Sequence, residues 1–389
     1  MIPRNAGKTL TALAREYPVL VVTGPRQSGK TTLCKATFPD RPYASLEEPD
    51  VRRFAVEDPR GFLAQYPDGA LLDEVQRAPE LLSYLQGIVD RKPSPGSFVL
   101  TGSQQLDVVA GVSQTLAGRA ALLSLLPFSL GELPASLAPR SIEQLLYRGL
   151  YPPIFDRELD PSRWYANYVQ TYIERDLRQL VNVRDLSSFQ VFLRLCAGRT
   201  GQLLNLSVLA ADCGVTHNTA RTWLSVLEAS FIVMQLRPHF RNFGKRLVKT
   251  PKLYFLDAGL AAWLLEIRDE EQLKAHPLRG ALFETWAIVE LIKGRANAGL
   301  ASNLYFWRDR AGLEVDCVVD RGTVLVPLEI KSGQTVASDF FSPFSRFAEL
   351  AGDLACPGWI VYGGDRIEKR SAATVLPWRS IERVVESNL

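Results

Sequence analysis

The chain has little of what several classes of protein depend on. Its 389 residues include only three histidines, and its five cysteines are odd in number and form no Cys-x-x-Cys pair. These counts exclude a His-rich metal cluster, a zinc ribbon and a disulfide scaffold. Reduced thiols are typical of a cytoplasm, so a cytoplasmic location is expected.

Long uncharged apolar runs are also missing. The stretch 120–131 carries no charge but holds only twelve residues, fewer than the ~20 that a membrane-spanning helix needs. Residues 1–15 lack the apolar segment of a signal peptide. We therefore expect no membrane partner.

What is present resembles an ordinary soluble protein. Apolar residues make up 47% of the chain and charged residues 22%, with a formal net charge of +3. At ~100–200 residues per domain, the length indicates two or three domains. Because the overall charge is nearly balanced, any nucleic-acid partner must be recognised by a local basic segment.

The first third of the chain alternates short apolar runs with helical stretches. Val19–Thr23, Ala70–Asp73 and Phe98–Thr101 are predicted to be buried strands, each followed by a polar turn. This alternation predicts an α/β fold with a parallel sheet covered by helices. From residue 136 to 201 the pattern is mainly helical.

A phosphate-binding loop follows the first predicted strand. Residues 24–31 fit the pattern G-x-x-x-x-G-K-[ST], in which glycines let backbone N–H groups surround phosphates. We expect Lys30 to contact the β and γ phosphates of ATP and the Thr31 hydroxyl to hold Mg²⁺. The candidate nucleotide-binding residues of the loop are Gly24, Pro25, Arg26, Gln27, Ser28, Gly29, Lys30, Thr31 and Thr32.

The ends of the next strands predict the rest of the ATP site. Asp73 ends an apolar strand and is expected to bind Mg²⁺, while Glu74 is placed to polarise an attacking water. Ser103 or Gln104, after the third strand, is a candidate for sensing the γ-phosphate or orienting water. An ordinary strand-to-loop turn is the alternative for these two residues.

A helix-turn-helix pattern with two following strands lies between residues 206 and 255. Helices are predicted over Leu206–Cys213 and His217–Glu228, and strands over Phe231–Arg237 and Lys252–Phe255. This order is typical of a winged helix. The spacing places Ala220, Trp223, Leu224 and Leu227 in the core and leaves Asn218, Arg221, Thr222 and Ser225 exposed.

The segment between the two strands is strongly basic. From Arg237 to Lys252 there are six basic residues and no acidic ones, a pattern suited to a polyanion. DNA is therefore an expected partner. The alternative is a structural winged helix whose wing contacts a neighbouring subunit. The predicted DNA-binding residues are Asn218, Arg221, Thr222, Arg241, Lys245, Arg246 and Lys249.

Carboxylates gather in the last third of the chain. A hairpin is predicted from strands Leu313–Val319 and Val324–Lys331. Strict alternation turns one face of the first strand toward the core and places Glu314 and Asp316 on the opposite face. The residues predicted on the core face are Leu313, Val315, Cys317 and Val319. Glu329 and Lys331 are predicted to share that second face.

A third carboxylate comes from the predicted helix Arg279–Ile292. Glu284 lies there among apolar neighbours, so a charged partner is expected. A divalent ion held by Glu284, Asp316 and Glu329, with Lys331 steadying a nucleophilic water or phosphate, matches the residue order of PD-(D/E)XK nucleases. The alternative is a structural ion-pair network without a metal.

Taken together, these motifs resemble one family. The P-loop, Leu72-Asp-Glu-Val-Gln76 and Thr101-Gly-Ser-Gln104 are similar to those of bacterial and archaeal AAA+ ATPases that carry a C-terminal DUF4143 domain. The similarity continues through Leu116–Arg119, Leu126–Glu132, Tyr172–Asp176, Tyr254–Gly259, Arg279–Glu284, Glu314–Asp316 and Glu329–Lys331.

The resemblance implies an architecture with four segments. These are a P-loop AAA+ ATPase domain at 1–135, a helical lid or linker at 136–202, a winged-helix domain at 203–262 and a PD-(D/E)XK nuclease-like α/β domain at 275–389. It also implies a homo-oligomer in which an arginine approaches the nucleotide of a neighbouring subunit. Arg119 is the first candidate and Arg175 the second, and a surface arginine paired with a carboxylate is the alternative for each.

The expected function is an ATPase that couples its nucleotide state to DNA binding, with branched DNA among the candidate ligands and nuclease activity left open. The alternative is a nucleotide-dependent switch or scaffold whose inactive nuclease fold binds proteins. A protein-remodelling machine is the weakest hypothesis, because the sequence shows no evident pore loop for gripping a substrate.

Overall fold

The computed structural model describes residues 2–103, 112, 114–173, 186–239, 249–309 and 312–388. The chain divides into two compact units, the first made of 1–128, 229–231 and 296–300 and the second of the rest. All five cysteines are free thiols. Among the described residues, no helix combines the length and apolar character needed to cross a bilayer.

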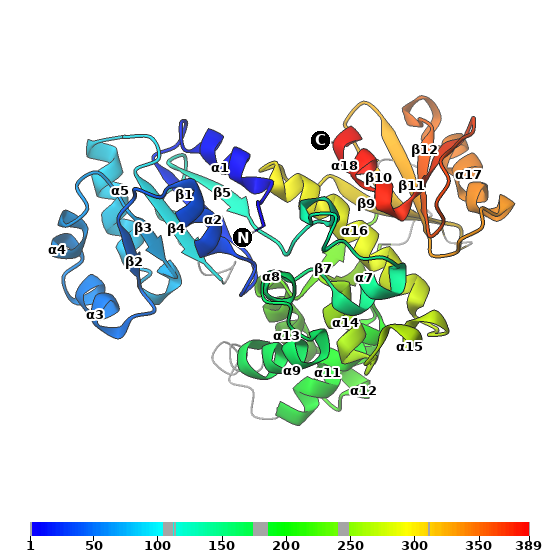
Figure 1. Ribbon diagram of the computed structural model, residues 1–389, viewed down its shortest axis with the longest axis horizontal. Helices are drawn as coiled ribbons and strands as arrows, with labels where there is room; N and C mark the ends of the chain where they lie inside the picture. The colour runs from blue at the N-terminus through cyan, green and yellow to red at the C-terminus, as the bar shows by residue number, and fades with distance from the viewer. Residues whose placement is uncertain are drawn as a thin grey trace. The chain divides into compact units, whose positions relative to one another are not determined.

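Unit 1 is built on a five-stranded parallel sheet in the order β2-β3-β4-β1-β5 (Figure 1). Because the sheet is covered on both faces, β1 and β4 are continuous apolar runs that are buried along their whole length. The three predicted strands are confirmed. The strands are β1 (Val19–Thr23), β2 (Tyr43–Ser45), β3 (Leu71–Asp73), β4 (Phe98–Gly102) and β5 (Ala120–Ser124).

Two apolar clusters pack on this sheet, one with Phe62 and Leu85 and the other with Leu10 and Leu33. Each cluster is completed by helices that turn one apolar face inward. The sheet therefore holds the loops that follow β1, β3 and β4 at the same edge. The helices are α1 (Ala6–Leu13), α2 (Lys30–Thr37), α3 (Pro49–Glu57), α4 (Pro59–Ala64) and α5 (Leu81–Arg91).

Unit 2 begins with helices and a small antiparallel sheet in the order β6-β8-β7. The predicted helix-turn-helix elements and the strand pair after them are present, with bounds that differ by at most two residues. The elements are α7 (Ile142–Arg148), α8 (Pro152–Asp156), α9 (Pro161–Tyr168), α11 (Leu186–Gly198), β6 (Gln202–Leu203), α12 (Leu206–Asp212), α13 (His217–Ala229), β7 (Val233–Leu236), β8 (Lys252–Phe255), α14 (Ala258–Leu264) and α15 (Glu270–Lys274).

The C-terminal part of unit 2 is a six-stranded mixed sheet in the order β13-β14-β12-β11-β10-β9. Backbone hydrogen bonds join Arg237 and His239 to Phe306 of β9, so the segment that follows β7 pairs with the edge strand of this sheet through one isolated bridge. The elements are α16 (Arg279–Asn297), β9 (Leu304–Arg308), β10 (Glu314–Asp320), β11 (Leu325–Lys331), α17 (Ser342–Ala351), β12 (Gly358–Tyr362), β13 (Glu368–Lys369), β14 (Ala373–Pro377) and α18 (Glu382–Ser387).

The predicted hairpin of β10 and β11 is confirmed, but strict alternation along β10 is wrong. The pairing of β10 with β9 shifts by one residue between Val315 and Val318. An extra residue in one strand reverses the faces beyond it. Val315 therefore packs with Val318 and Leu325 instead of sharing a face with Cys317. Helix α16 also extends beyond its predicted end at Ile292.

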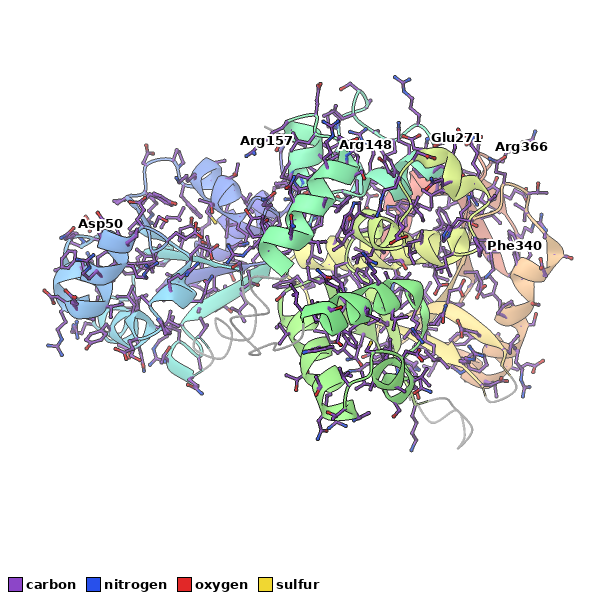
Figure 2. All side chains as sticks on the ribbon, turned by 90° about the horizontal axis from the view of Figure 1, so that it is seen from below. Asp50, Arg148, Arg157, Glu271, Phe340 and Arg366 are labelled. Atoms are coloured by element: carbon purple, nitrogen blue, oxygen red, sulfur yellow. The ribbon has the colours of Figure 1, made fainter. Side chains whose placement is uncertain are left out.

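Charged side chains lie on the outside of both units. Asp50, Arg157, Glu271 and Arg366, labelled in Figure 2, are all exposed. Charged side chains are seldom fully buried unless they are paired. Buried charged groups are the informative exceptions. Two groups of them are described next, while Asp257, Glu290 and Lys293 are buried elsewhere in unit 2.

Candidate functional site

The loop between β1 and α2 is shaped by two glycines. Gly24 has a φ of +149°, and a Cβ added there would lie 2.1 Å from the carbonyl oxygen of Leu125. Gly29 is left-handed, with a φ of 92°, and precedes α2 without a side-chain cap. Because the first N–H groups of a helix lack partners within the helix, this turn presents backbone donors to a ligand.

Lys30 is folded into this loop. Its ammonium donates to the carbonyl oxygens of Gly24 at 2.9 Å and Pro25 at 2.8 Å. Burial lowers the pKa of Lys30 to about 8, although the charges of Glu74 and Asp73 act in the opposite direction. In the free protein the Lys30 amine therefore loses its proton more easily than an exposed lysine does. A bound anion would favour the protonated ammonium again.

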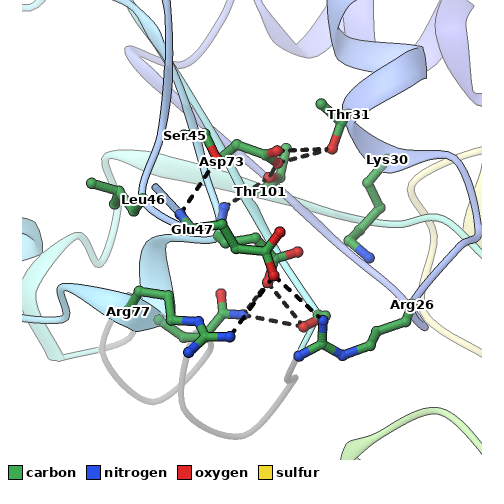
Figure 3. A network of polar contacts seen from close by, with 12 residues as sticks. Arg26, Lys30, Thr31, Ser45, Leu46, Glu47, Asp73, Arg77 and Thr101 are labelled. Atoms are coloured by element: carbon green, nitrogen blue, oxygen red, sulfur yellow. Dashed lines mark hydrogen bonds and ion pairs between the residues drawn. The ribbon is translucent and has the colours of Figure 1, made fainter. Parts of the chain in front are cut away.

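Thr31 and Asp73 meet at the edge of the sheet, as Figure 3 shows. The Thr31 hydroxyl donates to the two carboxylate oxygens of Asp73 at 2.9 and 3.1 Å. Thr101 and Tyr43 also donate to this carboxylate, the latter over 2.9 Å. Burial and the charge of Asp73 raise the pKa of Tyr43 to about 12, which keeps its hydroxyl a donor.

Glu74 lies one residue beyond β3, in a left-handed conformation with a φ of 59°. Its carboxylate accepts hydrogen bonds from Gln76 and, over 3.1 Å, from the Ser103 hydroxyl. Gln76 also donates to Ser103 over 3.1 Å. The structure thus places Ser103 beside Glu74, while Gln104 lies outside the described residues.

Arg26, Arg77 and Arg119 of unit 1 form ion pairs. Arg26 and Arg77 each lie 3.8 Å from the carboxylate of Glu47 (Figure 3). Arg119 contacts Asp90 of its own chain in two hydrogen bonds, one of them 3.1 Å long. Arg175 lies outside the described residues. The contact of Arg119 with Asp90 agrees with the alternative, a surface arginine paired with a carboxylate. That Arg119 approaches the nucleotide of a neighbouring subunit stays a prediction.

The residues around the loop fit a nucleotide with Mg²⁺. The Ser28 hydroxyl is buried and has no hydrogen-bond partner among the described residues. This hydroxyl and the backbone N–H groups of the loop that starts at Gly24 are polar groups that phosphate oxygens could contact. Thr31 and Asp73 offer the hydroxyl and carboxylate oxygens that Mg²⁺ prefers. Thr32, also predicted to bind nucleotide, is exposed on the first turn of α2.

A second group of charges lies in unit 2. One oxygen each of Glu284, Glu314 and Asp316 lie within 4.8 Å of one another, and we call these three residues the carboxylate cluster. The ammonium of Lys252, from β8, contacts Glu314 and lies 2.9 Å from Glu284. The Tyr254 hydroxyl donates to the same oxygen of Glu284 over 2.5 Å.

Glu329 and Lys331 lie next to the carboxylate cluster but outside it. Lys331 is 2.5 Å from Glu329 and 3.0 Å from Asp316. Burial, with the charge of Asp316, raises the pKa of Glu329 well above its ordinary value. Of the three predicted metal ligands, Glu284 and Asp316 lie together in the carboxylate cluster. Glu329 instead forms an ion pair with Lys331. The third member of the cluster is Glu314, which was not among the predicted ligands.

Lys252 was missed in the sequence because it belongs to a basic segment. Burial opposes its charge, but Glu284 and Glu314 outweigh burial and raise the pKa of Lys252. Its side chain is only 3% exposed, which is rare for a lysine without anionic partners. The available signal was the single lysine that opens an otherwise apolar strand, Lys252–Phe255.

The exposed face of α13 carries the predicted DNA-contacting residues. Asn218, Arg221, Thr222 and Ser225 are exposed, whereas Ala220, Trp223, Leu224 and Leu227 are buried, as expected. The Thr222 hydroxyl donates back to the carbonyl of Asn218 at 3.0 Å. Lys249 is exposed. Arg241, Lys245 and Arg246 lie outside the described residues.

Three family models match consecutive parts of the chain. They are an AAA domain over residues 16–134, the domain of unknown function DUF8612 over 139–271, and the domain of unknown function DUF4143 over 279–381. The AAA match contains the loop, Asp73 and Glu74. The DUF4143 match contains the carboxylate cluster.

Two mycobacterial proteins are similar to most of the chain. The uncharacterized proteins Mb2031c of Mycobacterium bovis and Rv2008c of Mycobacterium tuberculosis are each 34% identical to it over 336 residues. The match covers 85% of this chain and 74% of each relative. The similarity therefore extends well beyond the AAA domain.

Solved structures show weaker similarity. The Walker-type ATPase of Pyrococcus abyssi is 15% identical, with 68% of this chain and 96% of that chain covered and a TM-score of 0.41. AMPPCP-bound DnaA from Aquifex aeolicus is 17% identical, with 57% and 85% covered and a TM-score of 0.28. The assignment of the chain rests on the sequence matches.

Proposed function

The chain belongs to the family of AAA-domain ATPases with a C-terminal DUF4143 domain, and from this premise we propose that it hydrolyses ATP and couples its nucleotide state to DNA binding. The observation that carries the ATPase part is the loop after β1, where Gly24 permits a path that a side chain would block and Lys30 lies inside the turn. This arrangement supports polyphosphate binding.

The residues have distinct roles in the proposed reaction. Lys30 leaves its carbonyl partners and places its charge against the phosphates. Thr31 and Asp73 hold Mg²⁺, which supplies charge neutralisation for the phosphates when bound. Glu74 accepts the proton of the attacking water, and Ser103 and Gln76 hold its carboxylate in the free protein. Tyr43 orients Asp73 through its hydroxyl.

Turnover and nucleotide binding separate these roles experimentally. We expect Glu74→Gln to retain ATP binding and to lower kcat by at least about a hundredfold, because it removes the proton acceptor. Steady-state ATPase assays and nucleotide-binding titrations on the same preparation measure both. Turnover close to wild type would show that Glu74 is not the base.

The DNA part of the proposal rests on the exposed face of α13 and on the acid-free basic segment after β7. In DNA-binding proteins with a helix-turn-helix, the second helix lies in the major groove. We propose that Asn218, Arg221 and Thr222 contact the duplex, with Lys249 and the basic residues Arg241, Lys245 and Arg246 contacting phosphates.

Salt-dependent binding tests this part directly. We expect Arg221→Ala to weaken DNA binding and, if Arg221 contacts a phosphate, to reduce the log–log salt slope by about one. Arg157→Ala, at an exposed arginine outside the helix-turn-helix, is the control and is expected to bind as wild type does. ATPase rates are measured with duplex, single-stranded and branched DNA. Equal rates in all cases and binding insensitive to salt would contradict the DNA proposal.

A second candidate function is a nucleotide-dependent switch whose C-terminal domain binds proteins instead of cutting DNA. It is favoured by the ion pairs of unit 2, because Glu284, Glu314, Asp316 and Glu329 each have a cationic partner within 3.0 Å. Metal-dependent cleavage through Glu284, Asp316, Glu329 and Lys331 stays a prediction. A cleavage assay with Mg²⁺ or Mn²⁺ that compares wild type with Asp316→Ala distinguishes the two candidates.

A further inference from the structure

The nuclease resemblance implies a divalent cation among the carboxylates of unit 2. The carboxylate cluster has the oxygen donors for such an ion, with one oxygen of each residue within 4.8 Å of the others. A metal site also needs those oxygens to be available and the cluster to carry excess negative charge. The contacts of each carboxylate therefore decide whether a metal fits.

Each carboxylate of the cluster already has at least one oxygen engaged by groups of the chain, and Glu314 has both engaged. Glu284 accepts from Tyr254 and from Lys252, and Glu314 contacts Lys252 and, at 3.0 Å, Arg308. Asp316 contacts Lys331 at 3.0 Å and accepts the backbone N–H of Ile330 at 2.8 Å. As arranged here, these residues do not fit a divalent cation.

We propose that the ammonium of Lys252 is the resident counter-ion of the carboxylate cluster and excludes a divalent metal from it. The lysine reaches the cluster from β8, a strand of the small sheet, whereas Glu314 and Asp316 belong to β10 of the large sheet and Glu284 to α16. Its side chain is 3% exposed. A metal entering the cluster would bring two positive charges beside an ammonium that is already buried, and the repulsion between them is strong where water is scarce.

The consequence is structural. Lys252 joins three elements that are far apart in the sequence, so the ion pairs hold the strand pair that follows the helix-turn-helix against the C-terminal sheet. The C-terminal domain then needs no metal for its fold. This inference is independent of the proposed ATPase function, since none of these residues belongs to the nucleotide site.

Counting bound Mn²⁺ tests the proposal on the full chain without nucleotide. Electron paramagnetic resonance of free Mn²⁺ gives the number of ions bound per chain. We expect wild type and Glu284→Gln to bind the same number. We expect Lys252→Met, which keeps an unbranched side chain as far as the ε position and removes the ammonium, to bind one ion more. The double variant Lys252→Met/Glu284→Gln should lose that ion again.

Two results would overturn the proposal. A wild-type Mn²⁺ site that disappears in Glu284→Gln would show that the lysine does not exclude the metal. Folded Lys252→Met without an additional ion would show that the lysine is not what excludes it. Should Lys252→Met fail to fold, the comparison of wild type with Glu284→Gln, repeated with Asp316→Asn, still decides whether the carboxylate cluster holds a metal.

Discussion

The buried amine of Lys30 makes nucleotide affinity depend on pH. In the free protein the pKa of Lys30 is lowered to about 8, mainly by burial. A bound polyphosphate favours the charged ammonium, so binding takes up a proton above pH 8. The apparent Kd for ATP should therefore rise about tenfold between pH 7 and pH 9, because each pH unit above the pKa of the free protein costs about a factor of ten.

Calorimetry in two buffers with different ionisation enthalpies measures this proton uptake. Lys30→Arg is the control, since a guanidinium keeps its charge throughout this range. Its affinity should be lower than that of wild type but nearly independent of pH between 7 and 9. A wild-type Kd that stays flat over the same range would contradict the role of Lys30 as a phosphate ligand.

Individual side chains also show where the sequence is informative. The placement of Lys30, Thr31 and Asp73 at one site could be predicted, because their spacing within short motifs is typical of a phosphate-binding loop. The contacts of Tyr43 with Asp73 and of Gln76 with Glu74 could not. Tyr43 lies on β2, thirty residues before its partner, and only the parallel pairing of β2 with β3 brings the two together.

Among the structural elements, the loop between β1 and α2 has the strictest local requirement. We predict that Gly24→Ala abolishes measurable ATP binding while the secondary structure of the chain is kept. The added methyl group would lie 2.1 Å from a backbone oxygen, so the loop must change its path. Isothermal titration and circular dichroism on the same sample measure both effects.

Gly87→Ala is the matched control for this variant. Gly87 lies inside α5, and its added Cβ would meet only the Arg91 side chain at 3.6 Å. Alanine in a helix is favoured over glycine by up to about 1 kcal/mol, so this variant should bind ATP normally and melt no earlier than wild type. Normal ATP binding by Gly24→Ala would show that the path of the loop is not essential.

The elements also show the limits of periodicity. The apolar runs of β1 and β4 and the amphipathic pattern of α13 were sufficient to predict them, because a buried strand and a half-buried helix have distinct spacings. The bulge in β10 was not predictable. It follows from how β10 pairs with β9 between Val315 and Val318, and no residue within Glu314–Asp320 marks it.

At the scale of the whole molecule, the prediction to test is that one subunit contributes an arginine to the nucleotide site of its neighbour. The family resemblance implies that Arg119 approaches a neighbour's nucleotide, while the structure pairs it with Asp90. We predict that Arg119→Ala lowers kcat at least tenfold and leaves ATP affinity unchanged, because such an arginine stabilises charge only in the transition state. Asp90→Ala frees the arginine and should keep turnover.

Subunit mixing distinguishes this role from a local one. Arg119→Ala mixed with Glu74→Gln should recover part of the turnover, because some interfaces then combine an intact glutamate with an intact arginine. An Arg119→Ala variant with wild-type kcat would leave the arginine as a surface residue paired with Asp90.

The long-range contacts of unit 2 were beyond the reach of sequence patterns. Lys252 belongs to a basic segment that predicts a polyanion partner, yet it is buried against Glu284 and Glu314. A single sequence gives the order of charged residues but does not show which of them are close together in the folded chain. Glu284, Asp316 and Glu329 were predicted to converge because they belong to one helix and one hairpin. Lys252 belongs to a strand of the other sheet, and its position in the sequence does not indicate which carboxylates it contacts.

Titration of the purified chain with ATP and Mg²⁺ by calorimetry tests most directly whether residues 24–31 bind a nucleotide. We predict saturable heat that corresponds to one ATP per chain for wild type and no saturable heat for Lys30→Ala. Absence of heat from wild type, with the protein shown to be folded by circular dichroism, would contradict nucleotide binding and with it the proposed coupling to DNA.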